Sequence, residues 1–286
     1  MSILFGLHGG IGNSLFCLPA IKALSRLASV NLCVEGDYDM TALWSRCCYV
    51  EKVYGPKDSL PRADDYMTGQ YVPAAFRGKP VQFCGWPRGE SQYARPEWAQ
   101  IKLKAVGDER KETVVDWLDR SSKNAPDIDF ALIPCGKPGS EWQRKKWDGF
   151  LQLANRLESR GKTVRAFGQR EEICASGLLG WWDGPRSLAA LPDYLLRCRV
   201  AVCTDSGIGH LASSLGIPVV MLFTATSQVK GEPVGDVFKI VSEGLPCAPC
   251  QSTPRWGACL DWRCRRIAVE RVEKEAINLL TGTNTM

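Results

Sequence analysis

The chain has 286 residues, of which 45% are hydrophobic and 23% charged, and its formal net charge at pH 7 is +5. That composition is sufficient for a hydrophobic core in one large or two small domains. It contains no run of about 18 apolar residues and no signal-peptide pattern at Met1–Leu7, so we expect a cytoplasmic protein without a transmembrane segment.

The chain opens with an expected β-strand, Ile3–Leu7, that leads into a glycine-rich turn over residues 8–13. A helix with one apolar face follows, and its apolar positions are Leu15, Leu18, Ile21, Leu24 and Leu27. Strand, glycine-rich turn and helix in this order are typical of a doubly wound α/β domain, where glycines let the backbone approach a ligand. The turn lacks the G-x-G-x-x-G spacing of dinucleotide-binding domains and the Gly-Lys-Ser/Thr ending of a P-loop.

The alternation of strands and helices continues to about residue 54 and then weakens. Residues 55–98 have no clear period, and long loops of this kind are usually functional, so we expect them to cover an acceptor. The expected elements of this half are strands Val30–Val34, Tyr49–Tyr54, Arg62–Met67 and Pro80–Cys84, and helices Met40–Arg46 and Trp98–Leu118. The polar segment 121–127 marks the expected domain boundary, between residues 122 and 123.

A second series of strands and helices follows this boundary. Its first strand leads into a basic, aromatic loop, CGKPGSEWQRKKW at 135–147, and an acidic pair, Glu171 and Glu172, follows its second strand. The expected elements are strands Ile128–Pro134, Thr163–Phe167, Val200–Cys203, Val219–Phe223 and Val237–Val241, and helices Trp147–Arg160, Ser187–Cys198 and Ile267–Leu280. Two such halves predict a ligand site in the cleft between them.

Residues 200–223, VAVCTDSGIGHLASSLGIPVVMLF, are the most informative stretch. They predict a strand, a loop, a helix that begins at Ser206 and Gly207 and ends before Gly216, and a second strand. The N-terminus of such a helix presents backbone N–H groups and the positive end of its dipole, which suit a diphosphate, and His210 lies on its first turn. The same pattern also fits an ordinary βαβ unit without a ligand.

Four patches of the chain, in the correct order, resemble glycosyltransferase family 9, whose best-known members are the ADP-heptose:lipopolysaccharide heptosyltransferases. They are LFGLHGGIGNSLFCLPAIKALSR at the start, RKKWDGFLQLANRLESRG, the TDSGIGHLASSLGIPVVMLF stretch, and the cysteine-rich PCAPCQSTPRWGACLDWRCRRI. The third patch matches an Asp-Ser/Thr-Gly-x-x-His-x-Ala signature and is the most specific. Together the patches extend over most of the chain.

The resemblance implies the α/β fold called GT-B, in which two Rossmann-like domains face each other across a cleft and the C-terminal helix packs back toward the N-terminal domain. Residues 1–122 then form the acceptor domain, and residues 123–286 form the nucleotide-sugar-binding domain with a cysteine-rich segment, 247–264, and the final helix. The implied activity is the inverting, metal-independent transfer of a sugar from a nucleotide-diphosphate sugar to a hydroxyl of a lipopolysaccharide-type glycan. The transfer requires no cofactor, and peripheral contact with a membrane is compatible with that acceptor.

The resemblance also implies roles for individual residues. Lys145, two positions before Trp147, matches a phosphate-binding lysine of the family, and a solvated charge in a basic run is the alternative. Glu171 or Glu172 matches an acidic residue that holds the ribose or base, and a carboxylate satisfied by a helix dipole is the alternative there. The remaining donor-binding candidates are Gly9, Gly10, Gly12, Thr204, Asp205, Ser206, Gly207 and His210.

The candidate catalytic residues are His8, Asn13 and Asp37. Heptosyltransferases carry an aspartate, proposed as the base that takes the acceptor proton, where this chain has Asn13, and an amide cannot act as a general base. His8 is adjacent, and histidine is a common general base, although a buried structural histidine is the alternative. Glu35 and Asp37, which follow the second expected strand, are further candidates.

Thirteen cysteines, an odd number and mostly within apolar runs, argue against a disulfide framework. Four of them form the cluster Cys247-x2-Cys250-x8-Cys259-x4-Cys264. Four cysteines that begin with a C-x-x-C pair can hold a structural zinc ion tetrahedrally, and reduced cysteines that pack together are the alternative. This cluster is the candidate metal site of the chain.

Two alternatives to glycan transfer stay open. Tryptophans alternate with arginines and lysines in residues 142–147 and 254–266, as on a nucleic-acid surface, which would suit transfer to a hydroxymethylated base of phage DNA. The net charge is too small to imply nucleic acid by itself. A nucleotide-sugar-binding protein without transfer is the other alternative, because the expected catalytic aspartate is missing.

Overall fold

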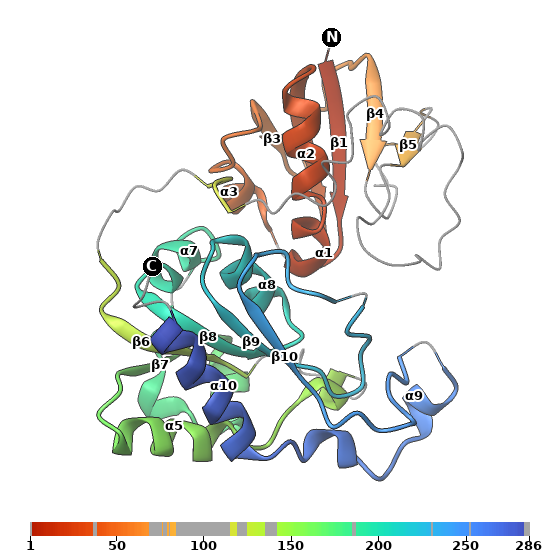
Figure 1. Ribbon diagram of the computed structural model, residues 1–286. Helices are drawn as coiled ribbons and strands as arrows, with labels where there is room; N and C mark the ends of the chain where they lie inside the picture. Colours follow the sequence, from red (N-terminus) through yellow and green to blue (C-terminus); the bar gives the residue numbers. More distant parts are fainter. Residues whose placement is uncertain are drawn as a thin grey trace. The chain divides into compact units, whose positions relative to one another are not determined.

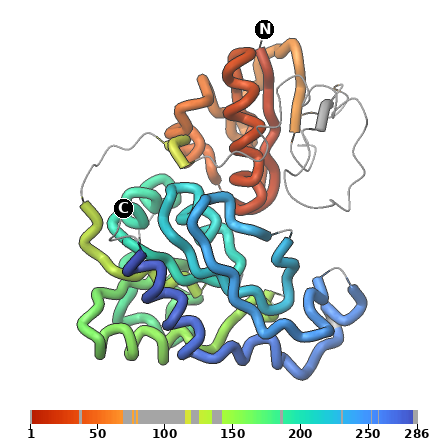
Figure 2. Tube along the Cα trace, viewed as in Figure 1, coloured from red at the N-terminus to blue at the C-terminus, as the bar shows by residue number. Residues whose placement is uncertain are grey.

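The chain divides into two compact units, Met1–Arg120 and Ser121–Met286. A computed structural model describes residues 2–36, 39–68, 76, 79, 81–83, 115–118, 125–134, 142–184, 187–229, 231–251 and 253–282. The expected boundary between residues 122 and 123 lies outside the described residues, as does most of the expected helix Trp98–Leu118. Figure 2 follows the chain through the two units from its red N-terminus to its blue C-terminus.

The first unit is built on a parallel sheet whose described strands lie in the order β3-β2-β1-β4-β5 (Figure 1). Its elements are β1 (Ser2–His8), α1 (Ile11–Leu15), α2 (Leu18–Ser25), β2 (Ser29–Glu35), α3 (Thr41–Trp44), β3 (Lys52–Tyr54), β4 (Asp65–Thr68) and β5 (Val81–Phe83). The central strand is β1, whose residues 3–7 are all buried, as a strand covered on both faces requires.

The single helix expected after the glycine-rich turn is in fact two helices. Helix α1 ends at Leu15, and α2 begins at Leu18 with Pro19 in its first turn. Proline lacks an N–H group and clashes with a preceding helical turn, so it is tolerated at the start of a helix and a break precedes it. Leu27, which we expected on the buried face, lies beyond α2 and is 56% exposed.

Residues 115–118, at the end of the expected helix Trp98–Leu118, are not helical. Leu118 forms an antiparallel bridge with Cys47, and the fully buried indoles of Trp117 and Trp44 lie with their centroids 5.3 Å apart. Burying two large aromatic rings outweighs helix propensity at this position.

The second unit has described strands in the order β10-β9-β8-β6-β7, and all neighbouring pairs are parallel. The strands are β6 (Ile128–Ile133), β7 (Val164–Ala166), β8 (Cys198–Thr204), β9 (Val219–Leu222) and β10 (Phe238–Val241). The helices are α5 (Phe150–Ser159), α6 (Arg170–Ala175), α7 (Leu191–Leu195), α8 (Gly207–Ser214), α9 (Arg255–Ala258) and α10 (Val269–Gly282), with 3-10 turns η3 (Trp142–Lys145), η4 (Leu179–Trp181) and η5 (Arg263–Arg265). Helix α7 is shorter than the expected Ser187–Cys198: it begins only at Leu191, with Pro192 in its first turn, and Cys198 already belongs to β8.

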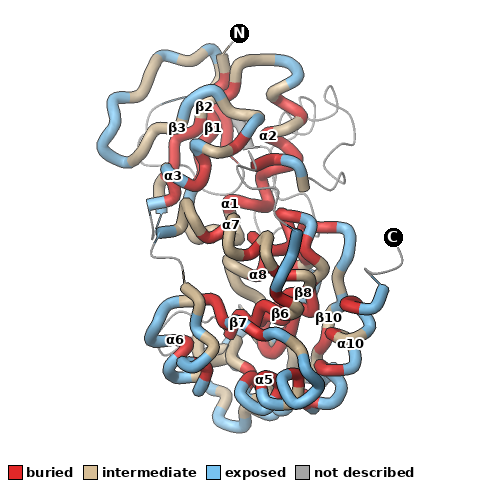
Figure 3. Tube along the Cα trace, turned by 90° about the vertical axis from the view of Figure 1, so that its left-hand side faces the viewer, coloured by how far each residue is buried: buried red, intermediate tan, exposed pale blue. Residues whose placement is uncertain are grey.

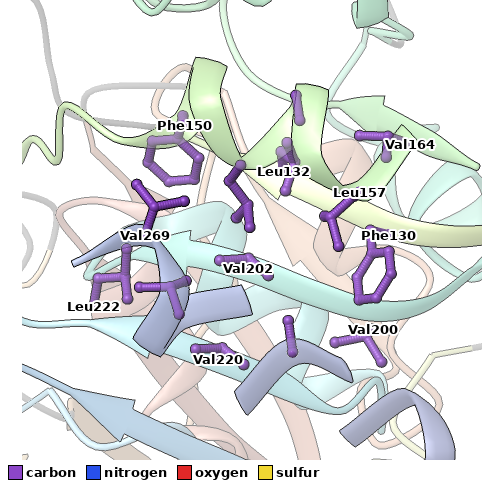
Figure 4. Close-up of a cluster of buried hydrophobic side chains, with 14 of the residues drawn as sticks. Phe130, Leu132, Phe150, Leu157, Val164, Val200, Val202, Val220, Leu222 and Val269 are labelled. Atoms are coloured by element: carbon purple, nitrogen blue, oxygen red, sulfur yellow. The ribbon is translucent and has the colours of Figure 1, made fainter. Parts of the chain in front are cut away.

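The core of the second unit lies between its sheet and the helices α5 and α10. Alternate residues of β6 and β8, such as Phe130 and Val202, pack here against Leu157 of α5 and Val269 of α10 (Figure 4). Most of β6 and β8 is buried (Figure 3). Helix α10 is the expected final helix, and it packs on α5 and on the sheet of its own unit. No helix in the part of the chain that the structure describes could cross a membrane.

Candidate functional site

The carboxyl ends of β6 and β8 lie at the place where the strand order of the second sheet reverses. The chain runs from β6 to β7 on one side of it and then returns to β8 on the other side. Open α/β sheets bind ligands at such a switch point, outside the carboxyl ends of the two strands. The loop after β6 carries η3, and the loop after β8 carries Asp205 and Ser206.

Lys145 and Asp205 meet at this switch point. Nζ of Lys145 lies 2.9 Å from Oδ2 of Asp205 and donates a hydrogen bond of 3.2 Å to the backbone carbonyl of the same residue. Nε2 of His210 lies 3.2 Å from the other carboxylate oxygen, Oδ1. The three side chains are largely removed from water, with exposed fractions of 17%, 13% and 3% for Lys145, Asp205 and His210.

The pKa of Asp205 is lowered although only 13% of its side chain is exposed. Burial acts to raise the pKa of Asp205, but the positive charge of Lys145 and the hydrogen bond with His210 outweigh burial and hold that pKa well below its usual range. An ammonium group has three N–H donors, and the contacts with Asp205 use two of them. The ring of Trp142 also lies 4.9 Å from this ammonium group, and no hydrogen bond between its third donor and another described residue is found.

Helix α8 begins directly after Asp205, as the sequence predicted. The Ser206 hydroxyl oxygen accepts a 3.2 Å hydrogen bond from the backbone N–H of Gly209, so Ser206 caps the helix, and Gly207 opens it. A Cβ at Gly209 would lie 2.5 Å from Sγ of Cys203, so glycine lets the first turn approach β8 closely. The remaining first-turn N–H groups point out of the helix end beside Asp205. Thr204, a donor-binding candidate, is fully buried at the end of β8.

The 3-10 turn η3 presents Lys145 to Asp205. Side chains three residues apart eclipse each other in a 3-10 helix, so Trp142 lies beside Lys145, with Nζ 4.9 Å from the ring centroid. Trp147 follows two residues later and is 4% exposed, and its Nε1 donates a 2.8 Å hydrogen bond to the carbonyl of Ile267. Trp147 therefore anchors the loop in the core of the unit.

The acidic pair after β7 divides into one structural and one exposed residue. The Glu172 carboxylate accepts a 3.4 Å hydrogen bond from the backbone N–H of Gln169 and forms a capping box at the start of α6. Glu172 is buried, whereas Glu171 is exposed on the first turn. The alternative of a helix-terminal carboxylate thus holds for Glu172, and Glu171 is the member that a ligand can reach.

In the first unit, the glycine-rich turn lies at the carboxyl end of β1, where the strand order of that sheet reverses. Gly9 has a φ of 97°, and a Cβ there would lie 3.0 Å from Nδ2 of Asn13. The side chain of Asn13 in α1 therefore lies against Gly9, which only glycine permits in this conformation. Gly10 is the N-cap of α1 and Gly12 lies within it.

His8 ends β1 beside Glu35 of β2. The two residues are partners in the parallel register, so their side chains leave the sheet on the same face. His8 is exposed, which removes the alternative of a buried structural histidine. Asp37, the third catalytic candidate, lies outside the described residues.

The four cysteines of the candidate metal site are neighbours in space. Burial raises the pKa of Cys264 to about 11, and the thiols of Cys250, Cys259 and Cys247 add to this shift. All four side chains are partly buried. Within the described residues, no group of three or more His, Cys, Asp or Glu side chains is arranged to hold a metal ion. The zinc site stays a prediction.

The tryptophans and cations that we considered for a nucleic-acid surface contact one another. The guanidinium of Arg144 lies 5.5 Å from the ring centroid of Trp256 and 5.4 Å from that of Trp262. The rings of Trp142 and Trp256 pack edge to face at 5.7 Å. Rings that neighbouring side chains cover do not offer a stacking platform for bases, so a nucleic-acid acceptor is not supported.

Two contributors to the site were not indicated by sequence reasoning. The Thr224 hydroxyl, after β9, donates a hydrogen bond to the carbonyl of Arg144. Arg144 itself was noted only as part of a basic run. The position of Thr224 after a buried strand was the one signal for it, and the two indoles that the Arg144 guanidinium contacts, Trp256 and Trp262, lie more than 100 residues away in the sequence.

Comparisons with known proteins agree on one family. A model of glycosyltransferase family 9 (heptosyltransferase) matches residues 109–258. Lipopolysaccharide heptosyltransferase 1 of Pseudomonas aeruginosa is 31% identical over 180 residues, which are 58% of this chain and 49% of that protein. The chain thus spans about half the length of this curated relative.

Solved structures with the same architecture cover nearly the whole chain. The ADP-heptose lipopolysaccharide heptosyltransferase II of E. coli has a TM-score of 0.68 at 18% identity and covers 99% of this chain and 100% of its own. The iron-containing dodecameric glycosyltransferase TibC of enterotoxigenic E. coli has a TM-score of 0.64 at 16% identity and covers 99% of this chain and 76% of its own. These likenesses confirm the predicted GT-B fold.

Replacing Asp205 by Asn should destabilise the protein in a pH-dependent way. The amide leaves the largely buried charge of Lys145 without its partner, which costs roughly 2–4 kcal/mol at pH 7. Because the pKa of Asp205 is lower in the folded than in the unfolded chain, its contribution is complete above the unfolded value of about 4 and is lost as the pH falls below it. Urea unfolding should show a constant difference from pH 7 to about 5, and a smaller one below about 4.

Asp127→Asn is the matched control for this measurement. Asp127 pairs with Arg197 at 2.7 Å on the surface of the same unit, where water screens the interaction. This variant should lose much less stability than Asp205→Asn. Equal losses in the two variants would contradict the role of Asp205.

Proposed function

Because this chain belongs to glycosyltransferase family 9, we propose that it transfers a sugar from a nucleoside-diphosphate sugar to an acceptor hydroxyl. The main support for the proposal is that Lys145, Asp205 and the N-terminus of α8 lie together at the switch point of the second sheet. A cation and a helix N-terminus at one point favour the binding of a diphosphate.

In the proposed reaction, the acceptor oxygen attacks the anomeric carbon while the bond from that carbon to the diphosphate oxygen breaks. A direct displacement of this kind inverts the configuration at the anomeric carbon. Negative charge grows on the departing diphosphate, and donors that are already aimed at it lower the barrier. Lys145 supplies the positive charge and α8 supplies the N–H groups, so the transfer needs no metal ion.

The neighbours of Lys145 have supporting roles in this scheme. Asp205 carries a negative charge, so it holds Lys145 rather than binding the diphosphate itself. His210 hydrogen-bonds the same carboxylate and fixes its orientation. Strand β7 lies next to β6 in the sheet and leads into α6, so the start of α6 follows the strand beside the switch point. Glu171 is exposed there, and in this scheme it accepts hydrogen bonds from the ribose.

The names of the relatives suggest the substrates. One relative is a lipopolysaccharide heptosyltransferase, and one structure of the same fold is an ADP-heptose lipopolysaccharide heptosyltransferase. ADP-heptose is therefore the donor that we propose, and a lipopolysaccharide-type glycan is the acceptor. The replacement of the family aspartate by Asn13 affects the acceptor side of the reaction and leaves the donor site unchanged.

His8 is the base that we propose for the acceptor proton. It is exposed at the carboxyl end of β1, five residues before Asn13, and an imidazole accepts a proton where an amide cannot. Glu35 is the register partner of His8 on the neighbouring strand β2.

The clustered cysteines suit a structural metal ion. Thiolates are the preferred ligands of zinc and of iron in four-sulfur sites. TibC, which shares the fold, is described as iron-containing. We propose that Cys247, Cys250, Cys259 and Cys264 draw together around one zinc or iron ion, which stabilises the cysteine-rich segment and takes no part in the transfer.

Lys145→Ala should weaken the binding of ADP by roughly 10- to 100-fold, because hydrogen bonds from a charged donor to the diphosphate are lost. Lys146→Ala is the matched control, since it removes the adjacent lysine of the same basic run. The affinity of this variant for ADP should stay within about twofold of the wild type. Calorimetric titration of the wild type and of the two variants with ADP, UDP and GDP measures these affinities. If the wild-type protein binds no nucleoside diphosphate, the proposed function is wrong.

His8→Gln should lower kcat by roughly 100-fold or more, while the affinity for ADP is unchanged. The acid limb of the pH profile of kcat should disappear, because that limb reports the protonation of the base. Transfer from ADP-heptose to a lipopolysaccharide-type acceptor is the assay. An unchanged pH profile would exclude His8 as the base, and a wild-type protein that binds the donor without turnover would favour the non-catalytic alternative.

The metal proposal predicts about one zinc or iron ion per purified chain, because a four-cysteine site holds one ion. Cys264→Ser should release the ion and lower the melting temperature. Cys174→Ser, which changes an exposed cysteine of α6, should keep both at the wild-type level. Elemental analysis measures the metal content of each protein, and a wild-type protein without bound metal would contradict the proposal.

A further inference from the structure

The two neighbouring cations Arg144 and Lys145 of η3 turn to different partners. A 3-10 helix has three residues per turn, so consecutive side chains leave it about 120° apart. Lys145 turns to Asp205, with Nζ 2.9 Å from the carboxylate. Arg144 turns to the cysteine-rich segment, 247–264, where its guanidinium lies over two indole rings.

A continuous series of ring contacts connects that segment to Lys145. The guanidinium of Arg144 lies 5.4 Å from the centroid of Trp262 and 5.5 Å from that of Trp256. Trp256 packs against Trp142 with centroids 5.7 Å apart and ring planes at 70°. Trp142 in turn lies 4.9 Å from Nζ of Lys145. The ammonium group therefore has Asp205 as one partner and a ring supported by the cysteine-rich segment as another.

Trp262 is held in a conformation that suits this contact. Among the residues that the structure describes, it is the one non-glycine residue with a positive φ, of 55°. A tryptophan adopts that conformation at a cost and keeps it where the surrounding contacts determine its position. The guanidinium of Arg265 also lies over its ring, at 5.1 Å, so two cations hold one indole.

Further contacts fix the loop beyond η3 to the residues that directly follow the same segment. Arg265 forms an ion pair with Asp148, and Nε1 of Trp147 donates to the carbonyl of Ile267 at 2.8 Å. Residues 142–148 are thus attached to residues 256–267 at several points. A displacement of the cysteine-rich segment would carry η3 and Lys145 with it.

We propose that Arg144, Trp256 and Trp262 are positioning residues that hold Lys145 at Asp205, so that the cysteine-rich segment sets the affinity of the site for the diphosphate. This inference rests on the proposed function for the identity of the ligand. A lysine has a flexible four-carbon stem, and a single 3-10 turn is too short to hold it without tertiary contacts. Arg144 acts through Lys145 rather than on the phosphate, because its guanidinium lies over the two indoles.

The test is a double-mutant cycle on the affinity for ADP. Trp262→Ala should weaken ADP binding by roughly five- to tenfold, the range expected when a partly desolvated cation–π contact is lost. In a Lys145→Ala background the same change should have an effect below about twofold, because the residue through which it acts is gone. Trp262→Phe keeps an aromatic ring and should restore most of the affinity.

Arg263→Ala is the matched control in the same segment. Its side chain is 61% exposed and pairs with Asp261, so its removal should leave ADP affinity unchanged. A loss that is equal in the wild-type and Lys145→Ala backgrounds would assign Trp262 a general structural role and overturn the inference. An unchanged affinity in Trp262→Ala would overturn it as well.

A second readout does not depend on the ligand. The contacts with Trp142 and Asp205 should protect the Lys145 amine from acylation, so Trp262→Ala should raise its acylation rate several-fold in peptide mass spectrometry, while that of Lys146 stays constant. An unchanged rate at Lys145 would contradict the inference even if no nucleoside diphosphate bound the wild type. Failure of the wild type alone to bind ADP would instead contradict the proposed function.

Discussion

The ion pair between Lys145 and Asp205 is the interaction on which the rest of the site depends. The sheet brings the carboxyl ends of β6 and β8 side by side, so the loops that follow them must approach each other. Two opposite charges that are largely removed from water are stable only as partners, because either one alone would keep its full desolvation penalty. The pair therefore locks the loop after β6 to the start of α8, and it places a cation at a helix N-terminus.

The parts of this site obey ordinary folding rules, and the ligand binding that we propose depends on their combination. Ser206 is a cap, Gly209 allows close packing of a helix on a strand, and Trp147 is a core residue with a satisfied indole N–H. Each of these is common in proteins without a site. Their joint effect is that a lysine with a flexible stem has one defined position, which preorganised electrostatic stabilisation requires.

Local patterns predicted most of the strands and helices, the resemblance implied how they assemble into the fold, and the contacts of the site were hard to predict because they join distant parts of the sequence. The periods of residues 200–223 predicted β8, α8 and β9, because strand and helix spacing are local properties. Lys145 and Asp205 were each donor-binding candidates through the resemblance, but the contact between them spans 60 residues and was not predicted, and the contacts of Arg144 with Trp256 and Trp262 had no motif to indicate them. Residues 115–118 were predicted wrongly for the same reason, since their pairing with Cys47 overrides local propensity. A helix-terminal role for Glu171 or Glu172 was among the predictions, but the sequence did not show which of the two takes it, because glutamine is an unusual N-cap and does not mark the start of α6.

Two features of the first unit are best understood together: Asn13 stands where the family carries an aspartate, and His8 is the register partner of Glu35 in the sheet. An amide in place of an aspartate removes the proton acceptor from the glycine-rich turn, while the contact with Gly9 keeps the turn in the conformation that only glycine allows. A transfer to a hydroxyl still needs an acceptor for its proton. The carboxyl end of β1 offers an exposed imidazole there, and the register of the sheet sets a carboxylate beside it. In the reaction that we propose, a change of base from carboxylate to imidazole would alter which acceptor hydroxyl can be reached, and it would leave the stabilisation of the leaving diphosphate by Lys145 as it was. In the proposed reaction, the two halves of the chemistry are therefore separable: the donor half keeps the pattern of the family, and the acceptor half is where this chain diverges.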